Sequence, residues 1–253
     1  MIIDSALQGH NDVVYDAIQA EYKDMANWYD TFWHSYTSQT LIEPIHQVME
    51  LGVGKNSNVV VDIACGTGEF FRRLRNLDDT NGSISEKPFN RKKKAPWIGI
   101  EPCPEMLKRA KEKFPKNDHA IAIVLHQAPA EYLPIKDHSA DIVVTTNAFH
   151  FFRDKQRALH EMRRILKGGG TLIITDWCND FWIVKLYHWL ERLRWNWRFE
   201  QKYPGPLKKS ELSELVNSEG FQDVEVSSYR VRVFGIFFWG MQTLKAHPIS
   251  GSI

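Results

Sequence analysis

The sequence predicts an α/β protein built around a doubly wound, mostly parallel β-sheet. Short apolar segments alternate along the chain with segments that have helical periodicity. The apolar segments are continuous rather than alternating, which is typical of strands that helices cover on both faces. A loop of small residues, DIACGTG at 62–68, follows the first of these strands, at the position where such sheets bind ligands.

The alternation of strands and helices can be followed along the whole chain. Residues 1–50 are predicted to be helical and contain many aromatic side chains. We expect strands at 58–63, 97–101, 119–126, 140–146 and 171–177, with helices at 69–77, 104–114 and 155–166. A glycine-rich turn at 167–170 should close the last of these strands at its N-terminal side. A long aromatic helix at 181–199, a helix at 209–218 and strand-like runs at 221–232 and 234–244 follow.

These elements predict one domain over residues 1–253 with two helical additions. The first is an N-terminal helical cap at 1–50, and the second is a helical insertion at 178–218, after the fifth strand. A polar connection at 78–97 is longer than most connections of its kind, so we expect a surface loop there. Its basic run at 91–94 is expected to be solvated, with contact to an anionic surface as the alternative.

The composition argues against several classes of protein. The formal net charge is +1, from 32 basic and 31 acidic residues, so no nucleic-acid partner is expected. Three widely spaced cysteines and scattered histidines indicate a reducing compartment and no metal site. The N-terminus lacks a signal-peptide pattern and no apolar run could span a bilayer, so we expect a cytoplasmic protein. Nothing in the sequence predicts an oligomeric state.

The loop at 62–68 is a poor cradle for phosphate. No Gly-Lys-Ser/Thr follows it, and Phe71 stands where a dinucleotide fingerprint has its third glycine. Asp62 and Glu69 flank the turn, which favours a ligand that is cationic or rich in hydrogen-bond donors. Glu101 ends the second strand, where a carboxylate can accept both hydroxyls of a ribose. A tight turn with no ligand is the alternative.

An ordered set of motifs extends this pattern beyond the loop. After DIACGTG come EPCPEML at 101–107, APAEYLP at 128–134, SADIVV, NAFHFF at 147–152 and EMRRILKGGGTL at 161–172. Over roughly residues 22–177 the chain resembles the class I S-adenosylmethionine-dependent methyltransferases. It is most similar to their small-molecule branch, including ubiquinone/menaquinone C-methyltransferases and trans-aconitate-methyltransferase-like proteins. The resemblance implies a Rossmann-like, seven-stranded sheet with one antiparallel strand, and S-adenosylmethionine as cofactor.

The resemblance also implies which residues meet the cofactor. The loop would lie under its methionine part, Glu101 would bind the ribose, and the remaining positions would meet adenine, the amino group or the outer side of the cofactor. The residues implied are Tyr29, Asp62, Ala64, Cys65, Gly66, Gly68, Glu101, Pro102, Met106, Ala130, Glu131 and Asn147, with Tyr22 and Trp33 as further aromatic residues that could fold over the cofactor.

Two positions depart from the family pattern. Ala64 replaces the usual first glycine, and its methyl group should be tolerated only if the residue keeps a negative φ. Pro129 stands where aspartate is common, so adenine recognition there should rely on backbone amides or on Gln127.

The methyl acceptor should be bound by segments outside the family pattern. The resemblance implies a small acceptor, and the aromatic residues of 1–50 and 178–218 indicate a hydrophobic or aromatic one. Within 178–218, Ile183, Tyr187, Leu190 and Arg194 share one helix face, and the aromatic side chains spread over more than one. Peripheral contact with a membrane, cation–π binding of an amine and plain packing are the alternatives.

Two residues are candidates for a catalytic base. Methyl transfer from a sulfonium is an in-line displacement, so a base is needed only if the acceptor must lose a proton. His150 follows the fourth strand, near the expected methyl group, with packing among phenylalanines as the alternative. Asp176 closes the fifth strand, with a helix-capping role as the alternative.

Two other functions are compatible with the same motifs. One is aminopropyl transfer from a decarboxylated cofactor. The other is a non-catalytic protein that binds S-adenosylmethionine as a sensor or scaffold.

Overall fold

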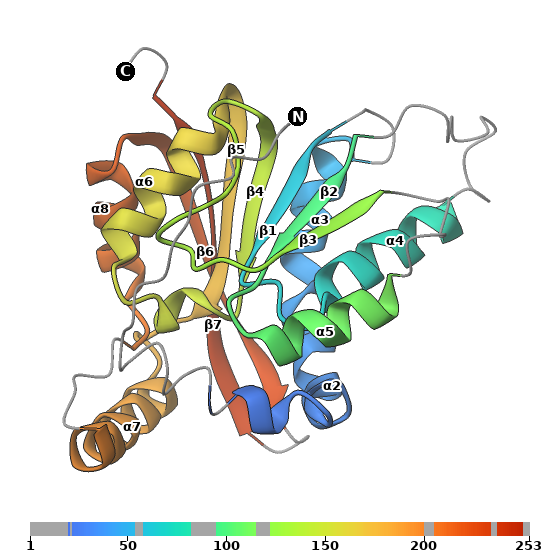
Figure 1. Ribbon diagram of the computed structural model, residues 1–253. Helices are drawn as coiled ribbons and strands as arrows, with labels where there is room; N and C mark the ends of the chain where they lie inside the picture. The colour runs from blue at the N-terminus through green and yellow to red at the C-terminus, as the bar shows by residue number, and fades with distance from the viewer. Residues whose placement is uncertain are drawn as a thin grey trace.

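A computed structural model describes residues 20, 22–53, 58–81, 95–114, 122–199, 205–233 and 237–249. Within these ranges, seven strands form one sheet in the order β3-β2-β1-β4-β5-β7-β6 (Figure 1). The strands are β1 (Val60–Ile63), β2 (Trp97–Ile100), β3 (Ile123–His126), β4 (Ala140–Thr146), β5 (Leu166–Trp177), β6 (Phe221–Val233) and β7 (Phe237–Pro248). β1 to β5 pair in parallel, and β7 pairs antiparallel with both β5 and β6. The predicted doubly wound, mostly parallel sheet is confirmed.

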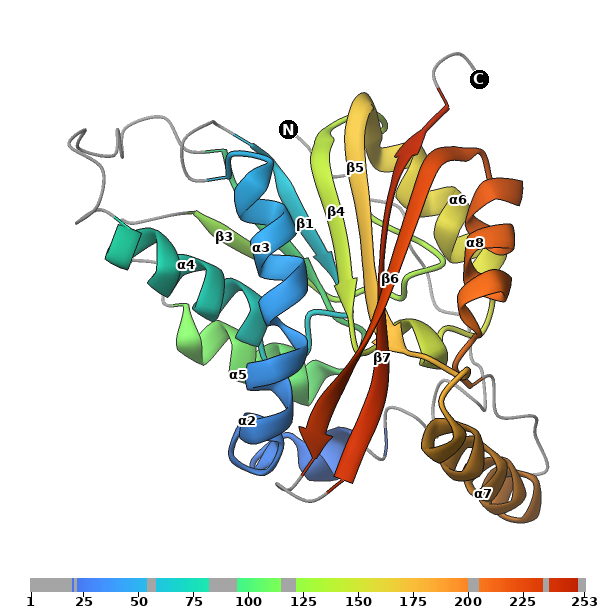
Figure 2. The same cartoon turned by 180° about the vertical axis from the view of Figure 1, so that it is seen from behind.

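Helices cover both faces of this sheet. The helices in the element order are α2 (Tyr29–Thr40), α3 (Ile42–Glu50), α4 (Glu69–Asn81), α5 (Pro104–Lys113), α6 (Lys155–Ile165), α7 (Trp182–Phe199) and α8 (Lys209–Ser218), with a short 3₁₀ helix η2 (Phe149–Phe151). α6 lies in front of the sheet in Figure 1, and α3 lies in front of it in the opposite view of Figure 2. The sheet is therefore the middle of three layers.

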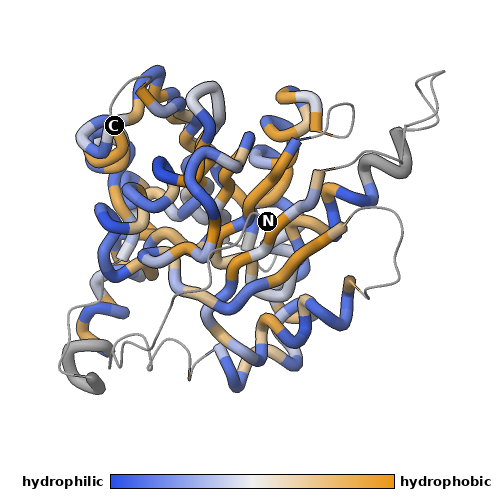
Figure 3. The backbone as a smooth tube through the Cα atoms, turned by 45° about the horizontal axis from the view of Figure 1, so that its top comes forward, coloured by the Kyte–Doolittle hydropathy of each residue, from blue (hydrophilic) through white to orange (hydrophobic). Residues whose placement is uncertain are grey.

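The two hydrophobic clusters follow from the alternation of side chains along the strands. Val60, Ile142 and Ile173 pack with side chains of α3 and α4 on one face. Their neighbours Val61 and Val143 point the other way and pack with α6 and α8. Both faces of each central strand are thus buried, and the centre of the molecule is strongly hydrophobic in Figure 3.

Local signals explain where individual helices begin. Asp154 precedes α6 and its carboxylate accepts a hydrogen bond from the backbone N–H of Arg157 at 2.9 Å, which satisfies one free donor of the first turn. Pro104 is the first residue of α5, where its missing N–H costs nothing. Helix α5 starts shortly after β2, whereas η2 lies between β4 and α6.

The glycine-rich segment before β5 differs from the prediction. A turn was expected at 167–170, but β5 begins at Leu166 and includes these residues. Leu166 pairs with Ala140, and the register then shifts before Thr171 pairs with Ile142. A Cβ on Gly170 would lie 2.8 Å from the Leu166 side chain and 3.0 Å from the Lys167 carbonyl, so glycine is favoured at this position, whereas an added Cβ on Gly168 or Gly169 would meet open space.

The two helical additions contact the same end of the C-terminal strand pair, since α2 bonds Arg232 of β6 and Tyr187 of α7 contacts Trp239 of β7. In α2, the Gln39 side-chain amide donates to the Arg232 carbonyl at 2.7 Å, and the Arg232 N–H donates back to Gln39 at 2.8 Å. Helices are present within 1–50 as predicted, and residues 1–19 lie outside the described chain. The basic run at 91–94 lies outside it as well.

Helix α7 is held against the sheet through one side only. Val184 is fully buried, and the Tyr187 ring makes edge contacts with Trp177 and Trp239 at centroid distances of 5.5 and 5.2 Å. In both ribbon views α7 stands at the lower margin of the molecule, beyond the carboxyl ends of the parallel strands (Figures 1 and 2).

Candidate functional site

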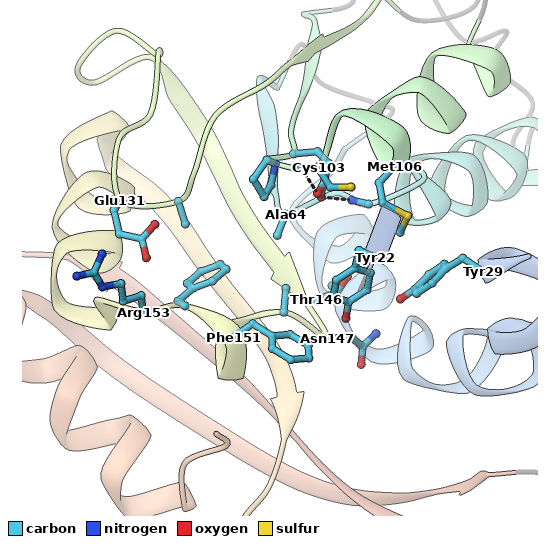
Figure 4. A pocket seen from close by; sticks show the side chains of 16 residues that line it. Tyr22, Tyr29, Ala64, Cys103, Met106, Glu131, Thr146, Asn147, Phe151 and Arg153 are labelled. Atoms are coloured by element: carbon cyan, nitrogen blue, oxygen red, sulfur yellow. Dashed lines mark hydrogen bonds between the residues drawn. The ribbon is translucent and has the colours of Figure 1, made fainter. Parts of the chain in front are cut away.

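A pocket lies at the carboxyl edge of the sheet, where β1, β2 and β4 end (Figure 4). Nine of the predicted cofactor residues line it: Tyr29, Ala64, Gly66, Glu101, Pro102, Met106, Ala130, Glu131 and Asn147. Tyr22, Cys103, Thr146, Ala148, Phe151, Phe152 and Arg153 complete its lining. The sequence motifs, which are far apart along the chain, therefore meet in one cavity.

The loop after β1 is held in a left-handed backbone conformation at three positions. Gly66 and Gly68 have φ of 55° and 77°, as glycine allows. A Cβ on Gly68 would lie 2.6 Å from the Phe114 ring, so a side chain there is excluded by packing as well. Ala64 has φ of 58°, and the expectation that it keeps a negative φ is wrong. A non-glycine residue is strained in the left-handed region, so Ala64 is strained at this turn of the loop.

Glu101 is the central polar group of the pocket. One carboxylate oxygen accepts from the backbone N–H of Gly66 at 2.8 Å, and the other accepts from that of Cys103 at 2.9 Å (Figure 4). The side chain thereby ties the loop to the end of β2. Burial raises the pKa of Glu101 to about 7, even though these two hydrogen bonds favour the charged form. A carboxylate has about four acceptor positions, so about two are left for a ligand.

Asp62 adds a second buried carboxylate beneath the loop. It is 1% exposed, and within the described chain neither of its oxygens has a hydrogen-bond partner. Burial, and then the nearby Glu101, raise its pKa well above the usual value. Such unsatisfied acceptors are costly without a donor or a cation nearby. The acid groups of this site therefore fit a ligand that brings hydroxyl donors and positive charge.

Glu69 does not belong to this acidic set. Its carboxylate accepts from Arg72 at 2.6 and 2.7 Å and from Arg73 at 2.7 Å, and it does not line the pocket. The two arginines hold the pKa of Glu69 down to about 2, against the opposing effect of burial. The interpretation of Glu69 as an acidic flank of the ligand site is wrong, because arginines of its own helix neutralise its charge.

Three predicted cofactor residues lie outside the pocket lining: Asp62, Cys65 and Gly68. Asp62 and Cys65 are buried, and Gly68 packs on Phe114. Gln127, the alternative adenine contact, donates to the Pro102 carbonyl at 3.1 Å, so it supports the segment after β2. Trp33 lines a neighbouring pocket instead.

That neighbouring pocket is lined mostly by aromatic side chains. It is formed by Tyr22, Met25, Trp28, Tyr29, Phe32, Trp33, Tyr36, Asn147, His150, Phe151, Trp177, Tyr187, Glu191 and Arg194. We call it the aromatic pocket. Four of these residues, Tyr22, Tyr29, Asn147 and Phe151, line both pockets, so the two cavities adjoin. The helical additions, α2 and α7, supply much of its wall.

The two predicted catalytic candidates meet in the wall of the aromatic pocket. His150 Nδ1 lies 2.6 Å from Asp176 Oδ1, and both side chains are almost fully buried. Asp176 also accepts from the backbone N–H groups of His150 at 2.5 Å and Trp177 at 2.8 Å. The imidazole stacks on Trp177 at a centroid distance of 4.1 Å and contacts Phe151 at 4.0 Å. Ring position and rotation are therefore fixed from three sides.

The hydrogen bond to Asp176 defines what the histidine can do. A carboxylate only accepts, so the proton of a neutral His150 resides on Nδ1, and Nε2 carries the free lone pair. Within the described chain, Nε2 has no hydrogen-bond partner. This arrangement can accept a proton from a bound hydroxyl, and Asp176 stabilises the imidazolium that results.

A second polar chain crosses the wall between the two pockets. Trp177 Nε1 donates to the Tyr36 hydroxyl at 2.6 Å, which donates to Asn147 Oδ1 at 2.9 Å. Asn147 Nδ2 donates to Thr40 Oγ1 at 3.0 Å. Asn147 lines both pockets and has φ of 55°, a left-handed conformation that asparagine adopts more readily than most residues, and bonds from α2 hold its side chain. The sequence offered no signal for this contact, because Tyr36 and Asn147 are 111 positions apart.

Two further properties concern the described residues only. No group of three or more His, Cys, Asp and Glu side chains among them could hold a metal ion. Among their helices, none combines the length and the apolar character needed to cross a membrane.

Comparison with known proteins agrees with the geometry. Residues 61–174 match a family described as a methyltransferase domain. A ubiquinone/menaquinone biosynthesis C-methyltransferase of Campylobacter jejuni is 26% identical over 207 residues, which cover 76% of this chain and 81% of that protein. Another, from Geobacter sp. strain M21, is 30% identical over 131 residues, which cover 51% of this chain and only 50% of that protein. A crystal structure of magnesium protoporphyrin IX methyltransferase from Synechocystis, with bound SAH, has a TM-score of 0.66 at 11% identity, over 93% of this chain and 99% of that one.

Proposed function

We propose that the chain is a class I S-adenosylmethionine-dependent methyltransferase and that it methylates a small hydrophobic or aromatic acceptor held in the aromatic pocket. The observation that carries this proposal is the wall shared by the two pockets, formed by Tyr22, Tyr29, Asn147 and Phe151. A cofactor in one cavity and an acceptor in the other would meet across these four side chains.

S-adenosylmethionine fits the first pocket through its hydroxyl groups and its positive charge. The free acceptor positions of Glu101 suit the two ribose hydroxyls, and Pro102 and Met106 offer an apolar surface for the adenine. The buried carboxylate of Asp62 favours the cationic amino-acid end. When bound, the cofactor supplies an electrophilic methyl group on a sulfonium sulfur.

The acceptor side is apolar and rich in rings. Trp28, Phe32 and Trp33 follow one another by edge-to-face contacts with centroid distances of 5.1 and 5.0 Å. Such a surface favours flat apolar molecules over highly charged ones. The relatives named for C-methylation in ubiquinone and menaquinone biosynthesis support a ring-shaped acceptor and transfer to carbon.

The residues of the chain contribute alignment and proton removal. Tyr22 and Tyr29 close over the junction of the pockets, exclude water and orient the acceptor for in-line attack. His150, oriented by Asp176, takes the proton of an acidic hydroxyl on the acceptor onto Nε2. Loss of this proton would leave the acceptor electron-rich, ready to take the methyl group as the carbon–sulfur bond of the sulfonium breaks to a neutral thioether. The roles of the predicted cofactor and catalytic residues are part of this proposal.

The test is transfer of a labelled methyl group from S-adenosylmethionine into fractionated cell extract, followed by mass identification of the product. We expect label in an organic-soluble, ring-containing molecule, and none with the Glu101→Ala variant. Saturable cofactor binding with no labelled product from any fraction would contradict the proposal and favour a sensor. Preferred binding of the decarboxylated cofactor would favour aminopropyl transfer instead.

A further inference from the structure

Helix α7 carries an exposed stripe of large apolar side chains. Trp182 is 73% exposed, Trp189 57%, Leu190 50%, Leu193 49% and Leu186 45%. These positions recur at intervals of three and four residues, so they lie along one face of the helix. We call this face the α7 stripe. Single exposed apolar residues need no explanation, but five in register form a continuous patch.

The α7 stripe is not the side that attaches the helix to the protein. Attachment is through the fully buried Val184 and through Tyr187, whose ring contacts Trp177 and Trp239. Tyr187, Glu191 and Arg194 line the aromatic pocket. One side of α7 therefore belongs to the aromatic pocket, and the side chains of the stripe are exposed. The helix itself stands at the margin of the molecule (Figure 2).

Basic residues border the stripe on both sides. At 100° per residue, exposed Lys185 and Arg192 fall along one border, and Arg194 falls along the other. The one acidic residue among the described side chains of α7, Glu191, lies on the inner side and pairs with Arg194 at 2.7 Å. An apolar face that contains tryptophans and has basic borders is the pattern of helices that lie in the interface of anionic bilayers.

We infer that the α7 stripe docks the protein on an anionic phospholipid surface. The tryptophans and leucines would enter the boundary between headgroups and acyl chains, and Lys185 and Arg192 would contact the headgroups. Because the opposite side of α7 lines the aromatic pocket, docking would bring this pocket close to the lipid. An apolar acceptor dissolved in the bilayer could then reach the pocket without crossing water.

Charge argues against a second copy of the chain as the occupant of this surface. The border formed by Lys185 and Arg192 is basic, and the one acid among the described side chains of α7, Glu191, already pairs with Arg194, so packing of the stripe on itself brings like charges together. An anionic surface complements the border of Lys185 and Arg192. The inference concerns where the protein works and goes beyond the chemistry proposed above.

The test is flotation of the purified full chain with vesicles of phosphatidylcholine alone and with an equimolar mixture of phosphatidylcholine and phosphatidylglycerol. We expect binding to the anionic vesicles that weakens as salt is raised. We expect the double variant Trp182→Ser/Trp189→Ser to bind these vesicles roughly tenfold more weakly than the wild type. Lys185→Gln/Arg192→Gln should bind about twenty-five-fold more weakly, on the order of fivefold for each charge. Ile42→Ser on α3, which is 65% exposed, is the matched control and should bind normally.

Three outcomes would overturn the inference. One is no binding to anionic vesicles at low salt. Another is full binding by both α7 variants together with loss of binding when the basic run at 91–94 is replaced by serines. The third is a stable dimer, seen by sedimentation, that the Trp182→Ser/Trp189→Ser change dissociates. Methyl transfer to an acceptor dispersed in detergent should be unchanged in Trp182→Ser/Trp189→Ser, because neither tryptophan lines either of the two pockets described above. Failure of docking and failure of the proposed function are therefore distinguishable.

Discussion

His150 and Asp176 lie on two different elements at the carboxyl edge of the sheet, and their side chains meet at 2.6 Å between Nδ1 and Oδ1. Asp176 closes β5 and His150 is in η2, after β4. Since β4 and β5 pair in parallel, the sheet brings the two residues together across 26 positions of sequence. The pair belongs to the wall of the aromatic pocket, so it is placed to act on whatever that pocket holds.

Replacing His150 by glutamine should remove catalysis and leave cofactor binding intact. General bases of this kind contribute about 10²–10⁴-fold to the rate, and we expect kcat to fall by at least 10²-fold. Steady-state kinetics and calorimetric titration with S-adenosylmethionine measure the two effects. A variant with normal kcat would show that His150 only packs.

Replacing Glu101 by glutamine should abolish the pH dependence of cofactor binding. In the free protein the pKa of Glu101 is about 7, so the carboxylate is increasingly protonated below that value and loses acceptor positions for ribose. We expect the wild-type Kd to rise by up to about tenfold per unit as pH falls below 7. Calorimetry should show weak binding at every pH for Glu101→Gln. A wild-type Kd that is constant across this range would contradict the placement.

The same substitution should make the free protein more stable at alkaline pH. The folded protein keeps a proton on Glu101 up to about pH 7, whereas the unfolded chain releases it near 4.5. Stability therefore falls as pH rises through this window, and the full cost is present above it. Glu101→Gln should raise the free energy of unfolding by up to about 2 kcal/mol at pH 8, with no gain at pH 4. Denaturant unfolding at the two pH values measures this, and an equal change at both would refute it.

Replacing Ala64 by glycine should stabilise the protein. The left-handed conformation costs a non-glycine residue about 1–2 kcal/mol, and the greater entropy of an unfolded glycine offsets about 0.5–1 kcal/mol of the gain. We expect a net increase of about 0.5–1 kcal/mol in the free energy of unfolding for Ala64→Gly. Ala158→Gly, at a buried position within α6, is the control and should destabilise by about 1 kcal/mol. Equal destabilisation by both changes would show that Ala64 is unstrained.

Replacing Tyr36 by phenylalanine should cost about 1–3 kcal/mol of stability. The change leaves Trp177 Nε1 without an acceptor and Asn147 Oδ1 without a donor in a largely buried setting. Tyr229→Phe is the matched control, because its hydroxyl makes one long contact to Thr243 at 3.3 Å, and it should cost less than about 1 kcal/mol. Thermal and denaturant melts compare the two. We also expect a higher KM for the acceptor in Tyr36→Phe, since Asn147 lines both pockets.

The sequence predicted the regular elements well because their signals are local. β4 and α8 have the predicted bounds, and most other elements differ by a few residues at their ends. Glu101 was identified because a carboxylate at a strand end is visible in sequence order. The conformation of Ala64 was predicted wrongly, because the path of the loop over the sheet decides its φ and the residue type does not.

Contacts between distant segments could not be predicted in the same way. His150 and Asp176 were each identified as a candidate, but their pairing depends on the neighbouring positions of β4 and β5. The expected shared face of α7 turns only partly toward the aromatic pocket. Tyr187 and Arg194 line that pocket, whereas Leu190, on the same face of the helix, is half exposed. Which aromatic side chains pack and which stay exposed is decided by where the helix rests on β7.

The most direct measurement is a crystal structure of the protein with S-adenosylhomocysteine and the acceptor identified by methyl labelling. The nucleoside is predicted beside Glu101 and Met106, with the acceptor ring in the aromatic pocket. A hydroxyl of the acceptor is predicted about 3 Å from His150 Nε2. An acceptor bound outside the aromatic pocket, or one held inside it with no polar atom near His150, would contradict the account.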